Sequence, residues 1–420
     1  MAACGLDFGT SNTTLGILRG DIPTLVALEG DEVTIPSAVF FSPSSEARIG
    51  RAAIEAYVEG LPGRLLRGLK SVLGSSLVDE ETQVGRLRLP FREVIARYVA
   101  AVKRRAEAQA GRELASVVHG RPVHFVDGDP EGDRSAEATL REIARIVGFR
   151  EVSFQFEPIA AALDYERQIG AEEMALIADI GGGTSDFSIV RLGPERHRLD
   201  ERSGDILANG GVRIGGTDFD RQLSLGTIMP LLGYRSAMRR PGLDVPSNYF
   251  HELATWSSIN RLYNRRIHRE LQEVRREAAQ PRLIERLLRV VETERGHTLA
   301  MEVEDAKISL SAEPRANVGL GWIEPELDVR LERQELASFT RELARRIAAQ
   351  IGLCLRQAAL SADRIDALFL TGGSTRIPHV RAAVMAAAPR AKVVDGDTFG
   401  SVGKGLTLEA ARRYGASAHA

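Results

Sequence analysis

Apolar residues follow two different periods along the chain. They recur every three or four positions through Phe91–Ala110, Arg134–Val147 and Glu335–Leu360, which predicts amphipathic helices. Short runs rich in apolar residues predict strands at Thr13–Leu18, Ile35–Phe41, Val117–Val126, Glu151–Phe156, Ala175–Ala178, Phe187–Val190 and Ala367–Thr371. Because strands and helices alternate, we expect an α/β protein.

Two of the expected strand pairs are joined by glycine-containing turns of similar sequence. The first turn lies within Asp7–Asn12 (DFGTSN) and the second within Asp179–Asp186 (DIGGGTSD). Both contain an aspartate, a glycine, Thr-Ser and a final Asn or Asp, in that order. Since a rare pattern repeated in separate halves of a chain indicates related units, we expect two lobes that face each other across one ligand.

The chemistry of these turns suits a phosphate group. Glycines allow close approach, so successive backbone N–H groups can form a concave nest around phosphate oxygens, and Thr184 and Ser185 add hydroxyl donors. A carboxylate at the mouth, such as Asp179, repels phosphate unless a hard divalent cation stands between them, and Mg²⁺ usually does so through waters. Taken alone, the second turn is equally compatible with an ordinary hairpin.

Composition and charge narrow the function classes. The 420 residues carry a formal net charge of −2 and are 44% hydrophobic, as in a folded chain of two or three domains. Arginines crowd Arg261–Arg295, but glutamates interleave with them, so we expect a solvated helical face there. No apolar run reaches membrane-span length and Met1–Gly5 lacks the features of a leader, so we expect a cytoplasmic protein without a nucleic-acid or membrane partner.

Four stretches in order along the chain, Gly5–Thr13, Asp179–Val190, Gly215–Asp220 and Leu370–Pro378, resemble the phosphate and adenosine motifs of the actin-like ATPase superfamily. The similarity is greatest to the ATPase domain of DnaK-type heat-shock chaperones. The stretches Phe154–Ala161 and Phe399–Leu406 resemble the short YegD-like branch, which lacks a peptide-binding domain.

This resemblance implies a two-lobed actin-like ATPase fold of duplicated ribonuclease-H-like domains with a central nucleotide cleft. Lobe I would span residues 1–168, with a small α/β subdomain at about 37–92, and would be completed by 390–420. Lobe II would span residues 169–389, with a mainly helical subdomain at about 215–320.

The resemblance also implies roles for individual residues. Asp7 and Asp179 would hold Mg²⁺ and its waters, while Lys70, Glu157 and Asp186 would act in hydrolysis at the terminal phosphate. Contacts to the nucleotide would come from Gly9, Thr10, Ser11, Asn12, Gly181, Gly182, Gly183, Thr184, Gly215 and Gly216. Of these, Thr10, Ser11, Gly182, Gly183 and Thr184 would contact phosphate oxygens. Without the resemblance, Lys70 is compatible with a surface lysine and Glu157 with a helix-start residue.

A nucleoside pocket is expected from spacing and resemblance together. Glu304, Lys307, Ile308 and Ser311 share one helix face, which in the chaperone family meets the ribose and adenine. An ordinary amphipathic helix would show the same spacing. Further nucleotide contacts implied by the family are Gly372, Gly373, Ser374 and Arg376. The chaperones commonly carry a second arginine where this chain has Ile308, so we expect weaker stacking on the base.

The implied function is that of an ATP-binding chaperone-like protein with weak ATPase activity, whose lobes open and close with the nucleotide state. ATP or ADP with Mg²⁺ would be its ligands, and a protein client or co-chaperone its partner. Because the chain ends at Ala420, we expect no peptide-binding domain. Two alternatives stay open: a sugar-kinase-like phosphotransferase, for which we identify no separate sugar-reading cluster, and an actin-like filament-forming ATPase.

Overall fold

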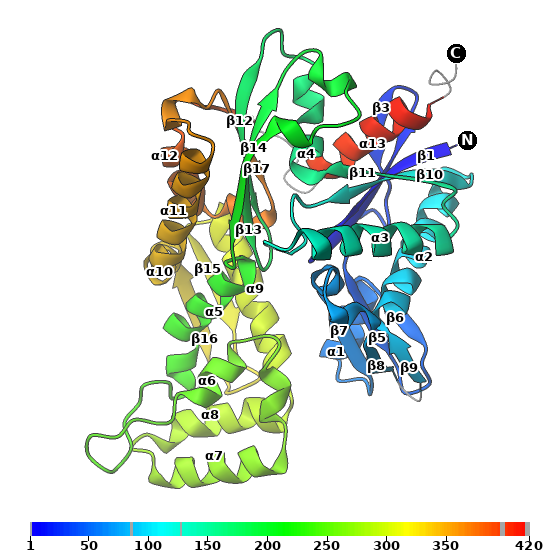
Figure 1. Ribbon diagram of the computed structural model, residues 1–420. Helices are drawn as coiled ribbons and strands as arrows, with labels where there is room; N and C mark the ends of the chain where they lie inside the picture. Colours follow the sequence, from blue (N-terminus) through cyan, green and yellow to red (C-terminus); the bar gives the residue numbers. More distant parts are fainter. Residues whose placement is uncertain (1, 85–86, 127, 395–399, 416–420) are drawn as a thin grey trace.

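The computed structural model describes residues 2–84, 87–126, 128–394 and 400–415. Two large β-sheets organise its two halves (Figure 1). Their strands are β1 (Ala2–Phe8), β2 (Asn12–Arg19), β3 (Ile22–Leu25), β4 (Thr34–Pro36), β10 (Leu114–Arg121), β11 (Glu151–Phe156), β12 (Glu173–Ile180), β13 (Ser185–Leu192), β14 (Ile206–Val212), β17 (Ala367–Thr371) and β18 (Lys392–Val394). We call the half around the first sheet lobe I and the half around the second sheet lobe II.

The two sheets have the same topology. The first has the order β11-β10-β1-β2-β3, with β4 also paired to β2, and the second has the order β14-β13-β12-β17-β18. In each, an antiparallel hairpin, β1/β2 or β12/β13, is followed by a parallel partner, β10 or β17. The duplicated two-lobed fold expected from the sequence is therefore confirmed.

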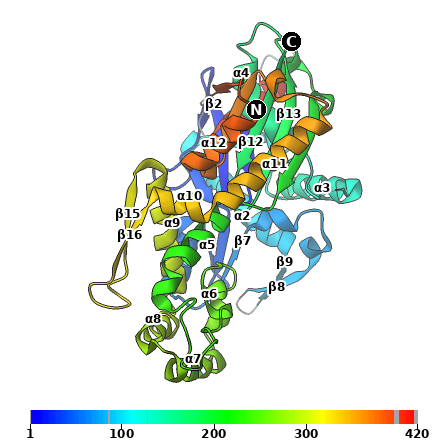
Figure 2. The same ribbon diagram turned by 90° about the vertical axis from the view of Figure 1, so that its left-hand side faces the viewer.

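Helices cover both faces of each sheet. In lobe I, α2 (Phe91–Ala110) and α3 (Pro130–Ile146) enclose one core with the first sheet. In lobe II, α11 (Arg341–Gln357) and α12 (Pro378–Ala387) cover the outer face of the second sheet (Figure 2). Two further helices, α4 (Glu157–Glu166) and α13 (Ser401–Tyr414), pack against each other, and between them they contact both sheets.

Each lobe carries an appended part on the same side of the molecule (Figure 1). The part on lobe I comprises β5 (Ala38–Phe41), β6 (Ala47–Ile49), α1 (Arg51–Val58), β7 (Arg64–Arg67), β8 (Glu81–Val84) and β9 (Leu87–Pro90). The part on lobe II comprises α5 (Gly216–Thr227), α6 (Asn248–Leu253), α7 (Arg265–Glu277), α8 (Pro281–Glu292), α9 (Gly296–Ala312), β15 (Arg315–Gly319), β16 (Asp328–Glu332) and α10 (Arg333–Phe339). The exact domain boundaries stay predictions. Through the described ranges, no helix has the length and apolar character needed to cross a membrane.

Several expected elements match closely and two are wrong. A third, the expected strand Val117–Val126, is shifted, because β10 spans Leu114–Arg121. Phe91–Ala110, Glu151–Phe156 and Ala367–Thr371 have the expected bounds. The expected strand Ile35–Phe41 divides at Ser37 into β4 and β5, which belong to different sheets. The expected helix Glu335–Leu360 divides at Thr340 into α10 and α11, and the Thr340 hydroxyl donates to the carbonyl of Leu336 at 2.6 Å.

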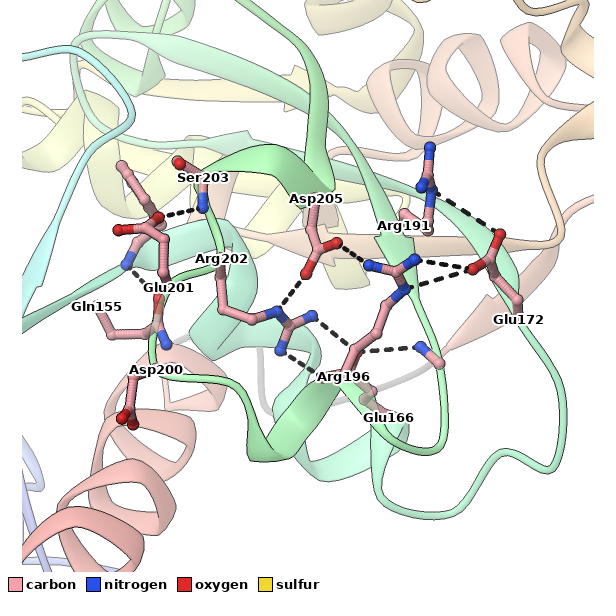
Figure 3. A network of polar contacts seen from close by, with 12 residues as sticks. Gln155, Glu166, Glu172, Arg191, Arg196, Asp200, Glu201, Arg202, Ser203 and Asp205 are labelled. Atoms are coloured by element: carbon pink, nitrogen blue, oxygen red, sulfur yellow. Dashed lines mark hydrogen bonds and ion pairs between the residues drawn. The ribbon is translucent and has the colours of Figure 1, made fainter.

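A buried ionic network fixes the connection between β13 and β14 on α4 (Figure 3). The Arg202 guanidinium, only 1% exposed, donates to both oxygens of Glu166 at 2.8 and 2.9 Å and also to Asp205. Glu166 is the last residue of α4, whose first residue is Glu157. Because an unpaired buried charge is very costly, this network holds α4 rigidly against lobe II.

Candidate functional site

The two glycine turns close in the same way. The Gly9 N–H donates to the Asn12 carbonyl at 3.0 Å, and the Gly181 N–H donates to the Thr184 carbonyl at 2.9 Å. In both hairpins the aspartate lies on the first strand, two residues before the closing glycine. The two turns therefore have the same length and align without a gap. In this alignment Thr10-Ser11 of the first turn corresponds to Gly182-Gly183 of the second turn. The match of Thr10-Ser11 with Thr184-Ser185 suggested by the sequence is wrong in register.

Hydrogen bonds from other segments of the chain engage the carbonyl groups of the second turn. The Gly181 carbonyl accepts from the Gly216 N–H at 2.9 Å and from Ser374 Oγ at 3.2 Å. The Gly182 carbonyl accepts from both the N–H and the hydroxyl of Thr217, at 2.9 and 3.0 Å. Residues at the start of α5 and in the segment after β17 thus engage the carbonyls of the turn.

Ser37 does the same for the first turn. Its Oγ donates to the Gly9 carbonyl at 2.6 Å, and its N–H donates to the Ser11 carbonyl at 2.9 Å. No N–H of Thr10, Ser11, Gly182 or Gly183 donates to another residue within the described ranges. Successive N–H groups left in this way form an anion-binding concavity.

The two turns meet. A Cβ built on Gly182 would lie 2.4 Å from Ser11 Oγ, so the tip of one turn touches the tip of the other. Thr10 approaches the Gly68 turn, which leads into the 3₁₀ segment Leu69–Val72 that carries Lys70. The expected meeting of both turns at one place between the lobes is seen in the structure.

Lys70 and Glu157 form an ion pair beside these turns. Lys70 Nζ lies 2.5 Å from Glu157 Oε1, and the side chains are 10% and 18% exposed. Burial alone would lower the pKa of Lys70, but the attraction of Glu157, Asp7 and Asp179 outweighs it, so the pKa of Lys70 is raised. Lys70 is therefore a charged, partly buried group and not a free surface lysine.

The two turn aspartates share this charge cluster. Burial, followed by the nearby Glu157 carboxylate, raises the pKa of Asp7 to about 7. Burial, followed by Asp186 and Glu157, raises the pKa of Asp179 to about 7. Carboxylates thus outnumber the single lysine, and this hard-oxygen donor set fits a divalent cation. Among the residues with a described placement, no three histidine, cysteine or acidic side chains are grouped as metal ligands.

A cavity opens beside the carboxylates, between the start of α4 and the second sheet. Glu157, Asp179 and Asp186 line it. Asp186 accepts a hydrogen bond from the Thr184 hydroxyl at 3.0 Å and is exposed. Other polar residues that line the cavity are His124, Ser188, Asn209 and Thr371.

The glycines expected near the nucleotide do more than contact it. A Cβ on Gly215 would lie 2.4 Å from the Gly183 nitrogen, and one on Gly372 would lie 2.3 Å from the Ile180 carbonyl oxygen. These glycines let α5 and β17 approach the second turn closely. Gly216 supports the same turn by its N–H. Gly373 begins the 3₁₀ segment Gly373–Arg376, which also contains Ser374 and the exposed Arg376.

The expected nucleoside face on α9 is only partly free. Lys307 is buried, pairs with Asp220 of α5 at 2.8 Å, and approaches the Gly216 carbonyl at 3.4 Å. Ile308 is 57% exposed and Glu304 is exposed, whereas the Ser311 hydroxyl donates back to the Lys307 carbonyl at 3.1 Å. Lys307 thus joins α9 to α5, and the open part of this face is at Glu304 and Ile308.

A further contact between the lobes was missed by sequence reasoning. Tyr57 of α1 lies against His297 of α9, with 3.2 Å between the hydroxyl and Nε2. The His297 ring also packs edge-on against Trp256, and the Arg67 guanidinium lies over the Trp256 ring at 4.9 Å from its centroid. We call Tyr57, Arg67, Trp256 and His297 the aromatic bridge. Lone aromatic residues give no sequence signal for such a contact.

Comparison with known families adds one finding. The family model described as Hsp70 protein matches residues 3–92, 88–225 and 291–412. These segments include both turns, the Lys70–Glu157 pair, the start of α5 and the exposed face of α9. The unmatched segment, residues 226–290, contains α6, α7 and all but the last two residues of α8.

Proposed function

The chain belongs to the Hsp70 family, whose members are ATP-binding chaperone-like proteins, and from this premise we propose that it hydrolyses ATP slowly in the cleft between its lobes. The observation that supports the proposal is that the two turns meet, and that hydrogen bonds from other segments engage their carbonyl groups. Their four N–H groups, which have no acceptor within the described ranges, would bind the phosphate chain from both lobes at once.

Each charged group has a role in the proposed reaction. Lys70 lies where a cation stabilises the charge of the terminal phosphate during transfer, and Glu157 both holds Lys70 in place and orients the attacking water. Asp7 and Asp179 would hold Mg²⁺ through waters, and the ion would neutralise phosphate charge. Asp186 completes the carboxylate group at the cavity.

Nucleotide binding is proposed to draw the lobes together. The turns belong to different lobes, so a phosphate chain bound to both favours the closed form by its differential affinity. The aromatic bridge adds a second contact, between the appended parts of the lobes. A client or co-chaperone would sense this change. The assignment to the YegD-like branch stays a prediction, and Phe399, part of its closing stretch, lies outside the described residues.

One observation favours a second candidate, the phosphotransferase. The cavity beside the carboxylates, about 60 Å³ in volume, is lined by Ser188, Asn209 and Thr371, and Ser188 donates to the Asn209 side-chain oxygen at 2.8 Å. An acceptor hydroxyl would have to join these polar groups. In that reaction, a carboxylate would accept the proton of the acceptor hydroxyl. The hydroxyl oxygen would bond to the terminal phosphorus as the bond from that phosphorus to ADP breaks and ADP leaves.

Phosphate release from ATP distinguishes the two. The purified protein is incubated with Mg·ATP alone and with glycerol or glucose, and free phosphate and phosphorylated acceptor are both measured. We expect slow phosphate release that no acceptor changes and that Glu157→Gln abolishes. Phosphorylated acceptor would establish the kinase. Turnover that Glu157→Gln leaves intact would assign the activity to a contaminant.

A further inference from the structure

A surface groove lies on the outer face of lobe II, away from the nucleotide cleft. It runs between α10, α11 and α12, which face the viewer in Figure 2, and has a volume of about 470 Å³. Its walls are Ala337, Ala344 and Ala383, and its polar lining is Gln334, Ser338, Arg341, Arg345 and His379. No carboxylate lines it. A groove of this size can hold several side chains of a bound peptide.

The charge of the groove has one sign. Helix α11 carries four arginines and a single glutamate, although the whole chain has a net charge of −2. Arg345 pairs with that glutamate, Glu342, at 2.6 Å, whereas Arg341 has no partner among the described residues. Arg341 also begins α11, where the helix dipole favours a nearby anion.

His379 lines the groove beside these arginines. Its Nε2 lies 2.7 Å from the Thr340 hydroxyl, which fixes the ring against the start of α11. Its Nδ1 is buried and has no hydrogen-bond partner within the described ranges.

We propose that this groove binds an acidic peptide segment of a partner protein, with Arg341 and Arg345 pairing with its carboxylates and the alanine walls contacting its apolar side chains. This interaction is separate from the nucleotide site and does not depend on the proposed ATPase activity.

Fluorescence anisotropy with a fluorescein-labelled peptide of Glu-Glu-Leu repeats tests the proposal. We expect saturable binding to the full chain at physiological salt and much weaker binding of the matched Gln-Gln-Leu peptide. Arg341→Gln/Arg345→Gln should weaken binding about fivefold to tenfold, since each exposed ion pair contributes up to about 1 kcal/mol. Ala383→Glu, which leaves both arginines in place, should weaken it as well.

The matched control removes two exposed arginines from α7. Arg265→Gln/Arg276→Gln makes the same change in net charge and should leave peptide affinity within about twofold. Equal loss in both double variants would overturn the proposal, because it would indicate attraction to net charge alone. Absence of saturable binding would also overturn it. So would tighter binding of a single-stranded oligonucleotide at the same arginines, which would assign the groove to nucleic acid.

Discussion

The two turns have the same backbone closure but different means of support. The first turn carries side chains at its tip, Thr10 and Ser11, and one residue, Ser37, holds its carbonyls. The second turn has bare glycines at its tip, and residues from α5 and the segment after β17 hold its carbonyls. A tip with side chains can supply hydroxyl donors, whereas a glycine tip lets another segment approach closely. The difference shows how one duplicated hairpin is supported in two different ways in the two lobes.

The largest expected effect comes from the cation beside the turns. Lys70→Ala should reduce ATP turnover about a hundredfold and weaken nucleotide binding much less, because the lysine charge matters most as the terminal phosphate departs. Single-turnover rates and calorimetric titration with ADP separate the two effects. Lys392→Ala, in β18, is the control and should change neither. Unchanged turnover in Lys70→Ala would remove Lys70 from the site.

The second prediction compares a glycine that packs against the second turn, Gly215, with a glycine at the tip of that turn, Gly183. In Gly215→Ala the new Cβ would lie 2.4 Å from the Gly183 nitrogen, whereas in Gly183→Ala it would meet nothing within 4 Å. Overpacking costs about 1–3 kcal/mol, so Gly215→Ala should weaken ADP binding roughly tenfold to a hundredfold. Gly183→Ala should change it less than threefold. Equal effects of the two variants would mean that α5 does not shape the second turn.

The third effect concerns the aromatic bridge. Tyr57→Phe removes the hydroxyl that lies 3.2 Å from His297 Nε2 and should speed ADP release about fivefold, since a hydrogen bond contributes about 0.5–1.5 kcal/mol. Stopped-flow release of a fluorescent ADP analogue measures this. Tyr249→Phe removes a comparable bond, to Glu270, wholly within lobe II and should leave release unchanged. Similar rates in wild type and Tyr57→Phe would show that the bridge does not slow ADP release.

The smallest expected effect is at the base. Ile308→Arg should tighten ADP and ATP binding alike, because a guanidinium on this exposed position can stack on adenine for about 0.5–2 kcal/mol. Ordering of the arginine and the charge of Lys307 oppose the gain, so we expect about threefold. Leu353→Arg, at a similarly exposed position on α11, should have no effect. If Ile308→Arg binds ADP as tightly as the parent protein or more weakly, this face of α9 does not contact adenine.

Local patterns predicted the hairpins well, because an apolar strand, an aspartate and a glycine turn are neighbours in sequence. The residues behind the turns could not be predicted in this way. Ser37, Thr217 and Ser374 act through hydrogen bonds to segments far from them in sequence, and Ser37 lies where the pattern suggested one continuous strand. Lys307 illustrates a second limit. Helical spacing predicted which face of α9 carries Lys307, but it could not predict the ion pair between Lys307 and Asp220.

The register of the turns shows a third limit. An alignment of Thr10-Ser11 with Thr184-Ser185 keeps the order of residue types. The closing hydrogen bonds from Gly9 and Gly181 instead align Thr10-Ser11 with Gly182-Gly183. Order along the chain does not fix which residue occupies a turn tip, whereas strand pairing does. The meeting of the two turns was therefore predictable from the sequence, whereas the register of one turn against the other was not.

The central claim is that the two turns bind a phosphate chain together, and thermal unfolding with ligands tests it most directly. ADP at millimolar Mg²⁺ should raise the melting temperature, because a ligand at a hundred times its Kd stabilises the folded state by about 2.7 kcal/mol. Adenosine, which lacks the phosphates, should give a much smaller shift. A melting temperature that ADP and ATP leave unchanged, or that adenosine raises as much as ADP does, would contradict the account.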